Sequence, residues 1–244
     1  MGKKKNEKIL CEPQFEAPET LEGCPFYGLE LDNEQKQFRD AIWDPNTDIV
    51  FVNADAGTGK TTVALGTANL LVKYGKFSQI IYMVAPTQEA KIGFLPGEPG
   101  EKLAPYFLPL YDAATTLGIN PFREINPCTD DWQPSGDGYI DCMTHNFLRG
   151  RNIDENTILL IDEAQNMYMD ELKTVLTRVH DGTKCIVIGH TGQCDLIKHA
   201  ERSGFAPYIE HFRNQPRCKI CELHNNHRGW ISKHADALTL RDAG

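Results

Sequence analysis

The run ADAGTGKTT, residues 54–62, constrains the fold of this chain more than any other segment. It directly follows a short apolar run, residues 49–52, and directly precedes an apolar-rich stretch, residues 61–74. The first pattern predicts a strand buried on both faces, and the second predicts a helix. The glycines at 57 and 59 let the backbone curl so that successive N–H groups face inward, and the helix dipole attracts an anion to them. The sequence therefore predicts a phosphate-binding loop between a strand and a helix.

Specific chemical roles follow for the loop residues. The Lys60 ammonium would reach the β- and γ-phosphates, and the Thr61 hydroxyl would be a ligand of Mg²⁺. The usual pattern begins with glycine where this chain has Ala54, and a Gly-rich turn without a ligand is the alternative interpretation. The residues expected to hold the nucleotide phosphates are Ala56, Gly57, Thr58, Gly59, Lys60, Thr61 and Thr62.

Two carboxylates follow a second apolar run, residues 158–161. Asp162 would hold the Mg²⁺ water shell, and Glu163 would polarise the attacking water, because hydrolysis needs one carboxylate on the metal and one on the nucleophile. Alone, such a pair more often caps the next helix. Together with the loop it predicts a nucleoside triphosphate hydrolase.

A third buried run, residues 184–189, ends in polar groups. Gln193 would sense the γ-phosphate and orient the attacking water. His190 would share this role or be a satisfied loop histidine, and the residues leave both interpretations open.

Alternating strands and helices predict an α/β fold with a mostly parallel central sheet flanked by helices. The expected strands are residues 49–52, 79–84, 139–143, 157–161, 184–189 and 219–223, and a further helix is expected over 170–179. Seven prolines between residues 93 and 138 predict a Pro-rich insertion of short helices and loops on top of the sheet, after the second strand. Residues 1–29 are expected to be a poorly ordered lead-in that packs only at spots such as Phe26 and Tyr27, and residues 30–244 one domain.

Composition restricts location and partners. No apolar run reaches the roughly 18 residues needed to span a bilayer, so no membrane partner is expected. Eight scattered cysteines fit reduced thiols and a cytoplasmic location. The net charge of −9 argues against a general polyanion-binding surface, so a nucleic-acid site would be a local basic track.

The order of the motifs resembles superfamily-one helicase-type ATPases: LDNEQ (31–35), ADAGTGKT, DEAQ, the Gln193 strand and HNNHRG (224–229). A closer resemblance comes from residues 86–113, which include GFLPGEPG, and from FLRGRN (147–152). Both look like the PhoH family of phosphate-starvation-inducible ATPases, found in bacteria and phages. The resemblance covers about residues 30–232. It implies a single RecA-like P-loop NTPase domain that uses ATP and Mg²⁺, and it is compatible with a phage-encoded origin.

The resemblance also assigns residues beyond the loop. Gln35 would read adenine, and Arg228 would act as an arginine finger on the γ-phosphate. This chain departs from the family at His190, where Asp is usual, and at His227, where an aromatic residue is usual. Both departures are expected to lie near the γ-phosphate. They therefore bear on how the γ-phosphate is sensed and not on nucleotide binding.

Basic residues near the family-specific segments are candidates for contacts with a nucleic-acid backbone: Lys91, Lys102, Arg149 and Arg151. Nearby aromatics would stack on bases, namely Phe94, Phe107 and Phe147. The alternative interpretation places the aromatics in the core and the arginines on a solvated turn.

One lobe of about 200 residues cannot by itself perform the two-lobed cycle of a motor helicase. The simplest completion is a head-to-tail ring in which Arg228, or another arginine, completes the site of a neighbour, and the family resemblance implies a hexamer. Such a ring repeats a few basic residues around a channel while the outside stays acidic.

Three other interpretations remain. A nucleoside kinase of the thymidine-kinase type also combines a phosphate loop with DEAQ, but it needs a second metal-ligand pair and a nucleoside-binding lasso, and we find neither. A nucleotide-gated assembly protein would bind ATP with little turnover. A zinc site is suggested by Cys218, Cys221, His224 and His227. The two cysteines lie on an expected strand and would point to opposite faces, which disfavours zinc.

Overall fold

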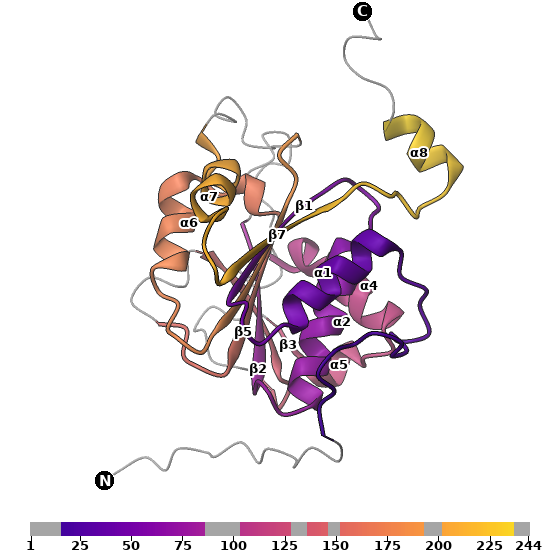
Figure 1. The fold of residues 1–244 in the computed structure, drawn as a ribbon, viewed down its shortest axis with the longest axis horizontal. Helices are drawn as coiled ribbons and strands as arrows, with labels where there is room; N and C mark the ends of the chain where they lie inside the picture. Colours follow the sequence, from indigo (N-terminus) through magenta and orange to yellow (C-terminus); the bar gives the residue numbers. More distant parts are fainter. Residues whose placement is uncertain (1–15, 86–102, 128–135, 146–151, 193–201, 237–244) are drawn as a thin grey trace, which may run out of the picture.

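The computed structural model describes residues 16–85, 103–127, 136–145, 152–192 and 202–236, and a seven-stranded sheet forms its centre (Figure 1). The spatial order is β3-β4-β2-β5-β6-β1-β7, and all six strand pairings are parallel. The strands are β1 (Ile49–Ala54), β2 (Gln79–Val84), β3 (Ile125–Asn126), β4 (Ile140–Thr144), β5 (Thr157–Asp162), β6 (Lys184–Gly189) and β7 (Cys218–Leu223).

Helices cover both faces of this sheet. One face carries α1, α2 and α4, and the other carries α6 and α7, whereas α8 stands apart from these layers (Figure 1). The helical elements are α1 (Asn33–Trp43), α2 (Lys60–Lys73), η1 (Ala104–Phe107), α4 (Leu108–Thr116), α5 (Pro121–Glu124), η3 (Ala164–Asn166), α6 (Met169–Leu176), α7 (Phe205–Phe212) and α8 (Trp230–Asp236).

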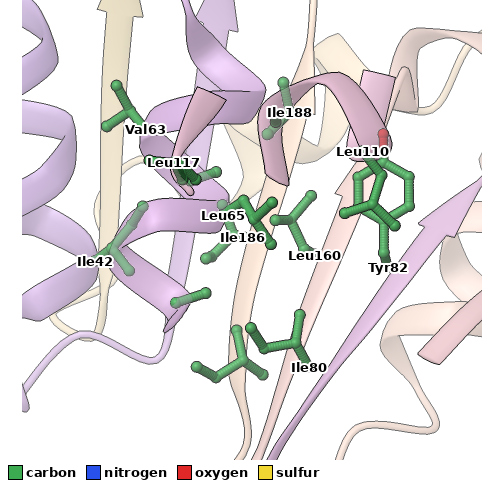
Figure 2. Close-up of a cluster of buried hydrophobic side chains, with 14 of the residues drawn as sticks. Ile42, Val63, Leu65, Ile80, Tyr82, Leu110, Leu117, Leu160, Ile186 and Ile188 are labelled. Carbon is green, nitrogen blue, oxygen red and sulfur yellow. The ribbon is translucent and has the colours of Figure 1, made fainter. Parts of the chain in front are cut away.

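The strands alternate their side chains between two apolar cores. In β1, Val50 and Val52 pack on the α2 side, whereas Ile49 and Phe51 pack on the α6 side. The core on the α2 side joins Leu65 of α2 to strand residues such as Leu160 and Ile186 (Figure 2). Burial on both faces explains why the central strands read as continuous apolar runs.

The predicted α/β architecture is confirmed, including all six expected strands to within one or two residues at their ends. Two details differ. The short edge strand β3 was not expected, and α6 ends at Leu176 rather than at residue 179, because Val179 forms a parallel bridge with Ile153.

The expected Pro-rich insertion contains short helices, as predicted. Rather than lying on top of the sheet, however, α4 packs Leu110 and Ala114 into the core beside α2, together with its C-cap residue Leu117. This part of the insertion therefore belongs to the helical layer that covers the sheet.

The described part of the lead-in packs at Phe26, as predicted, and also at Leu21 and Pro18, where packing was not predicted. Leu21 and Phe26 are each 3% exposed and belong to the core, and the Trp43 indole donates a hydrogen bond to the carbonyl of Pro18. Residues 16–29 therefore pack as part of the domain. Residues 1–15 lie outside the described part of the chain.

Candidate active site

The loop between β1 and α2 has the backbone that an anion-binding turn requires. Gly57 and Gly59 adopt φ values of 76° and 74°, which residues with a β-carbon rarely adopt. Gly59 is the N-cap of α2, so the first turn of that helix begins at Lys60. The N–H groups of this first turn have no partners within the helix, and together with the helix dipole they favour a phosphate group there.

The sheet order brings the β5 carboxylates to this loop. Strands β5, β6 and β1 are neighbours, so their carboxyl ends share one edge of the sheet. The Thr61 hydroxyl donates a 2.8 Å hydrogen bond to Oδ2 of Asp162, a residue 101 positions away in sequence. Asp162 is only 1% exposed. The two residues predicted to hold Mg²⁺ are therefore in direct contact.

Tyr82 on β2 is a member of this site that the sequence analysis missed. Its hydroxyl donates a 2.7 Å hydrogen bond to the same Asp162 oxygen, and its ring lies in the core beside Leu160 (Figure 2). Burial raises the pKa of Tyr82 well above its ordinary value, and the Asp162 charge adds to this effect. Tyr82 therefore stays protonated and acts as a fixed donor to the carboxylate.

Replacing Tyr82 with Phe should lower the free energy of unfolding by about 2 kcal/mol, because a buried carboxylate loses one of its hydrogen bonds. Urea denaturation of the wild type and of Tyr82→Phe would measure this. Tyr208→Phe on α7 is the matched control, since Tyr208 is only partly buried. Equal midpoints and slopes for all three proteins would contradict a structural role for the Tyr82 hydroxyl.

Glu163 occupies the turn that directly follows β5. Its φ of 55° is left-handed, which is strained for a residue with a side chain. Gln165 donates a 2.6 Å hydrogen bond to the Glu163 carboxylate and accepts a 3.1 Å hydrogen bond from the backbone N–H of His190. The Gln165 amide therefore links the β5 carboxylates to the end of β6. Gln165 belongs to the DEAQ motif, but no role was predicted for it from the sequence.

His190 has both ring nitrogens engaged. Its Nδ1 accepts a hydrogen bond from the N–H of Gly192 at 3.1 Å, and its Nε2 lies 2.8 Å from Oδ1 of Asp55. A ring nitrogen that accepts a hydrogen bond carries no proton, so in this geometry Nε2–H donates a hydrogen bond to Asp55. Of the two interpretations left open above, this geometry favours the satisfied loop histidine.

Gln35 lies against the phosphate loop. Its Nε2 donates a 2.8 Å hydrogen bond to the carbonyl of Thr58, and its Oε1 accepts a 3.1 Å hydrogen bond from the N–H of Asp32. The Asp32 side chain in turn accepts from the N–H of Gln35, which completes a capping box at the start of α1. Gln35 thus ties α1 to the loop, and adenine recognition by this residue stays a prediction.

The segment after β7 also lies over the loop. The N–H of His227 donates a 2.8 Å hydrogen bond to the carbonyl of Gly57. A β-carbon built on Gly57 would lie 2.7 Å from Oδ1 of Asn226 and 3.1 Å from Cδ of Arg228. The structure therefore places Arg228 beside the phosphate loop of its own chain, and glycine at 57 makes this close approach possible.

Several predicted residues lie outside the described part of the chain, namely Gln193, Lys91, Lys102, Arg149, Arg151, Phe94 and Phe147. Phe107 is described, and its prediction as a base-stacking residue is wrong. It is 3% exposed and packs edge-on against Tyr82 at a centroid distance of 6.2 Å. Phe107 is a core residue.

The strand placement predicted for Cys218 and Cys221 is confirmed. Cys218 belongs to the core on the α6 side, whereas Cys221 packs against the core on the α2 side. Two cysteines on opposite faces of a sheet cannot bind one zinc ion without rearrangement.

A family model described as PhoH-like protein matches residues 30–232. A PhoH-like protein of Mycobacterium leprae is 37% identical over 191 residues, which is 78% of this chain and 51% of that protein. This chain belongs to the PhoH family. Protein PhoH of Escherichia coli is 32% identical over 166 residues, covering 67% of this chain and 44% of that protein. The chain spans about half the length of the curated relatives it matches.

The large terminase of bacteriophage HK97 has a similar fold, with a TM-score of 0.50 at 16% identity over 93% of this chain and 44% of the terminase chain. The seven parallel strands and the loop after β1 form a RecA-like P-loop fold. Fold and family together support nucleotide binding and hydrolysis in general. No helix in the described ranges is both long and apolar enough to cross a membrane.

The residues present fit ATP with Mg²⁺. The loop offers backbone N–H groups and the Lys60 ammonium to phosphate, and Thr61 with Asp162 offers the hydroxyl and carboxylate oxygens that Mg²⁺ prefers.

Proposed function

We propose that this PhoH-family protein hydrolyses ATP at the carboxyl edge of β1 and β5, and couples hydrolysis to single-stranded RNA or DNA as a ring of subunits. The observation that supports ATP hydrolysis is the 2.8 Å hydrogen bond between Thr61 and Asp162, because it joins the loop to the β5 carboxylates. Bound Mg²⁺ would neutralise charge on the phosphates. A cytoplasmic location, which the scattered cysteines favour, is part of this proposal.

The residues of the site have distinct roles in the proposed reaction. The first turn of α2 and Lys60 bind the β- and γ-phosphates, and the loop glycines let the backbone approach them closely. Glu163 accepts a proton from the attacking water as the water adds to the γ-phosphorus and the bond to the β-phosphate oxygen breaks. Gln165 orients the Glu163 carboxylate through its 2.6 Å hydrogen bond. Gln193 would orient the same water.

Arg228 is proposed to stabilise the charge that develops on the γ-phosphate. Its position beside Gly57 supports an action on the nucleotide of its own subunit. Another arginine would then be needed for any contact from a neighbouring subunit. The ring, and a hexamer in particular, stays a proposal that rests on the family resemblance and on the need for more than one lobe.

Nucleic-acid coupling is tested with the basic residues Lys91, Arg149 and Arg151. Single-stranded RNA and DNA should each be tried as activators of phosphate release, and the salt dependence of binding should be measured. The double variant Arg149→Ala, Arg151→Ala should bind more weakly, and the slope of log affinity against log salt should fall by about 2. The control Arg213→Ala removes an exposed arginine on the edge of α7, where it pairs with Glu210.

The mass of the protein should be measured in parallel by sedimentation velocity with and without ATP. Activation by a single strand and a mass several times that of one chain are the expected results. A monomeric mass with no activation by RNA or DNA would refute the nucleic-acid motor and leave a simple ATPase. Transfer of phosphate from ATP to thymidine would instead identify a nucleoside kinase.

A further inference from the structure

The Asp55 carboxylate joins the ends of three neighbouring strands. Asp55 directly follows β1, and its N–H donates a 2.9 Å hydrogen bond to the carbonyl of Leu223 at the end of β7. Its Oδ1 lies 2.8 Å from Nε2 of His190, which follows β6, and its Oδ2 lies 3.0 Å from Nδ1 of His224, which follows β7. The Asp55 side chain, the first after β1, is therefore held by an imidazole on each side.

His224 differs from His190 because both of its ring nitrogens face carboxylates. Nδ1 faces Asp55, and Nε2 lies 3.4 Å from Oε2 of Glu222 on β7. A carboxylate only accepts hydrogen bonds, so both contacts are satisfied only when both ring nitrogens carry protons. Hydrogen bonds to Asp55 and Glu222 raise the pKa of His224 above its ordinary value. Partial burial acts to raise the pKa of Asp55, but hydrogen bonds from His224 and His190 outweigh it and lower that pKa.

The backbone of His224 is held as well. Its N–H donates a 2.7 Å hydrogen bond to Oε2 of Glu34 on α1. The charged or titratable groups that face His224 are thus Asp55 on the loop, Glu222 on β7 and Glu34 on α1, with His190 on the far side of Asp55. A further pair, His227 with Asp32 at 3.0 Å, lies farther along the same segment.

The contact between His224 and Asp55 is one of those that hold the segment that covers the loop. Beyond His224, the chain passes Asn226, His227 and Arg228, which lie directly over Gly57. Asn226 also donates a 2.9 Å hydrogen bond to the hydroxyl of Ser232 in α8. Loosening His224 from Asp55 would therefore loosen the residues that pack on the phosphate loop, Arg228 among them.

We propose that His224 is a positioning residue whose imidazolium, bridging Asp55 and Glu222, holds residues 224–228 on the phosphate loop in the geometry needed for ATP turnover. This inference rests on the proposed ATPase function. Turnover then falls as the pH rises and His224 loses its second proton, because one of the two bridges is lost. His224 is about half exposed, so each bridge is weak on its own and the expected effect is moderate.

The test is the dependence of kcat and KM on pH between 6 and 9. In the wild type, kcat should fall about fivefold from the acid to the alkaline end of this range. A change of this size is expected when one exposed ion pair is lost. His224→Gln should be low throughout and lack this fall. Glu222→Gln should move the fall to lower pH, and His224→Lys should stay active at more alkaline pH because lysine keeps its charge. His180→Gln, an exposed histidine at the opposite edge of the sheet, should match the wild type.

A wild-type kcat that does not change over this range, or an unchanged fall in His224→Gln, would overturn the inference. The failure of the proposed function is distinguishable, because it would appear as no ATP hydrolysis by the wild type at any pH. Titration of the His224 imidazole by NMR then still tests the bridge. Its pKa should be lower in Glu222→Gln than in the wild type, and equal values would show that the bridge does not form.

Discussion

Glu163→Gln should lower the rate of ATP hydrolysis about 10³-fold while leaving the Kd for ATP nearly unchanged. An amide has the shape of the carboxylate but cannot accept a proton from water. The left-handed backbone at residue 163 is equally strained for Glu and Gln, so the turn after β5 should keep its conformation. The variant therefore separates proton transfer from nucleotide binding.

The measurement pairs steady-state phosphate release with equilibrium binding of ATP. Glu155→Gln is the matched control, since Glu155 is an exposed carboxylate outside the strand ends that form the site. It should hydrolyse ATP at the wild-type rate. Full activity in Glu163→Gln would remove this residue from the reaction, and would favour a nucleotide-gated assembly protein if ATP also drove assembly without turnover.

Lys60→Ala should reduce ATP hydrolysis by at least about 10²-fold and should also weaken ATP binding, in contrast to Glu163→Gln. Lys60 is the only basic residue of the loop, residues 54–62, so its ammonium is the positive charge that the loop can offer to the phosphates. Alanine is the best helix former, so α2 should still begin at residue 60. A loss of binding with an intact fold is therefore expected.

Circular dichroism and thermal unfolding would check the fold of Lys60→Ala, and titration with a fluorescent ATP analogue would give the affinity. Lys173→Ala, an exposed lysine on α6, controls for the loss of one surface charge. Wild-type affinity and turnover in Lys60→Ala would mean that the phosphates bind elsewhere in the protein.

The sheet and the loop could be predicted because their signals are local. Buried parallel strands require continuous apolar runs, and a turn with two left-handed residues requires glycine at 57 and 59. Thr61 and Asp162 were each predicted to hold Mg²⁺, but their direct contact was not predicted, because it depends on the sheet order that places β6 between β1 and β5. The strands and the turn after β1 were therefore predictable from the sequence, and the roles of the site residues stay predictions.

Side-chain contacts between distant strands could not be predicted. Tyr82 reads as one more apolar residue of the strand QIIYMV, and nothing in that pattern shows that its hydroxyl reaches Asp162. The pairing of Asp55 with His190 and His224 depends on which strands flank β1, which local periodicity does not encode. Packing of the lead-in at Phe26 was predicted, whereas the burial of Leu21 was not, because a few buried residues suffice to anchor a segment that is mostly polar.

The most direct measurement is the release of inorganic phosphate from ATP by the purified wild-type protein, with Mg²⁺ and with EDTA, beside Asp162→Asn. The predicted result is turnover with Mg²⁺, its loss with EDTA, and a loss of at least about 10²-fold in Asp162→Asn. Hydrolysis that persists in EDTA, or that Asp162→Asn leaves intact, would contradict a shared metal and phosphate site formed by the loop and β5.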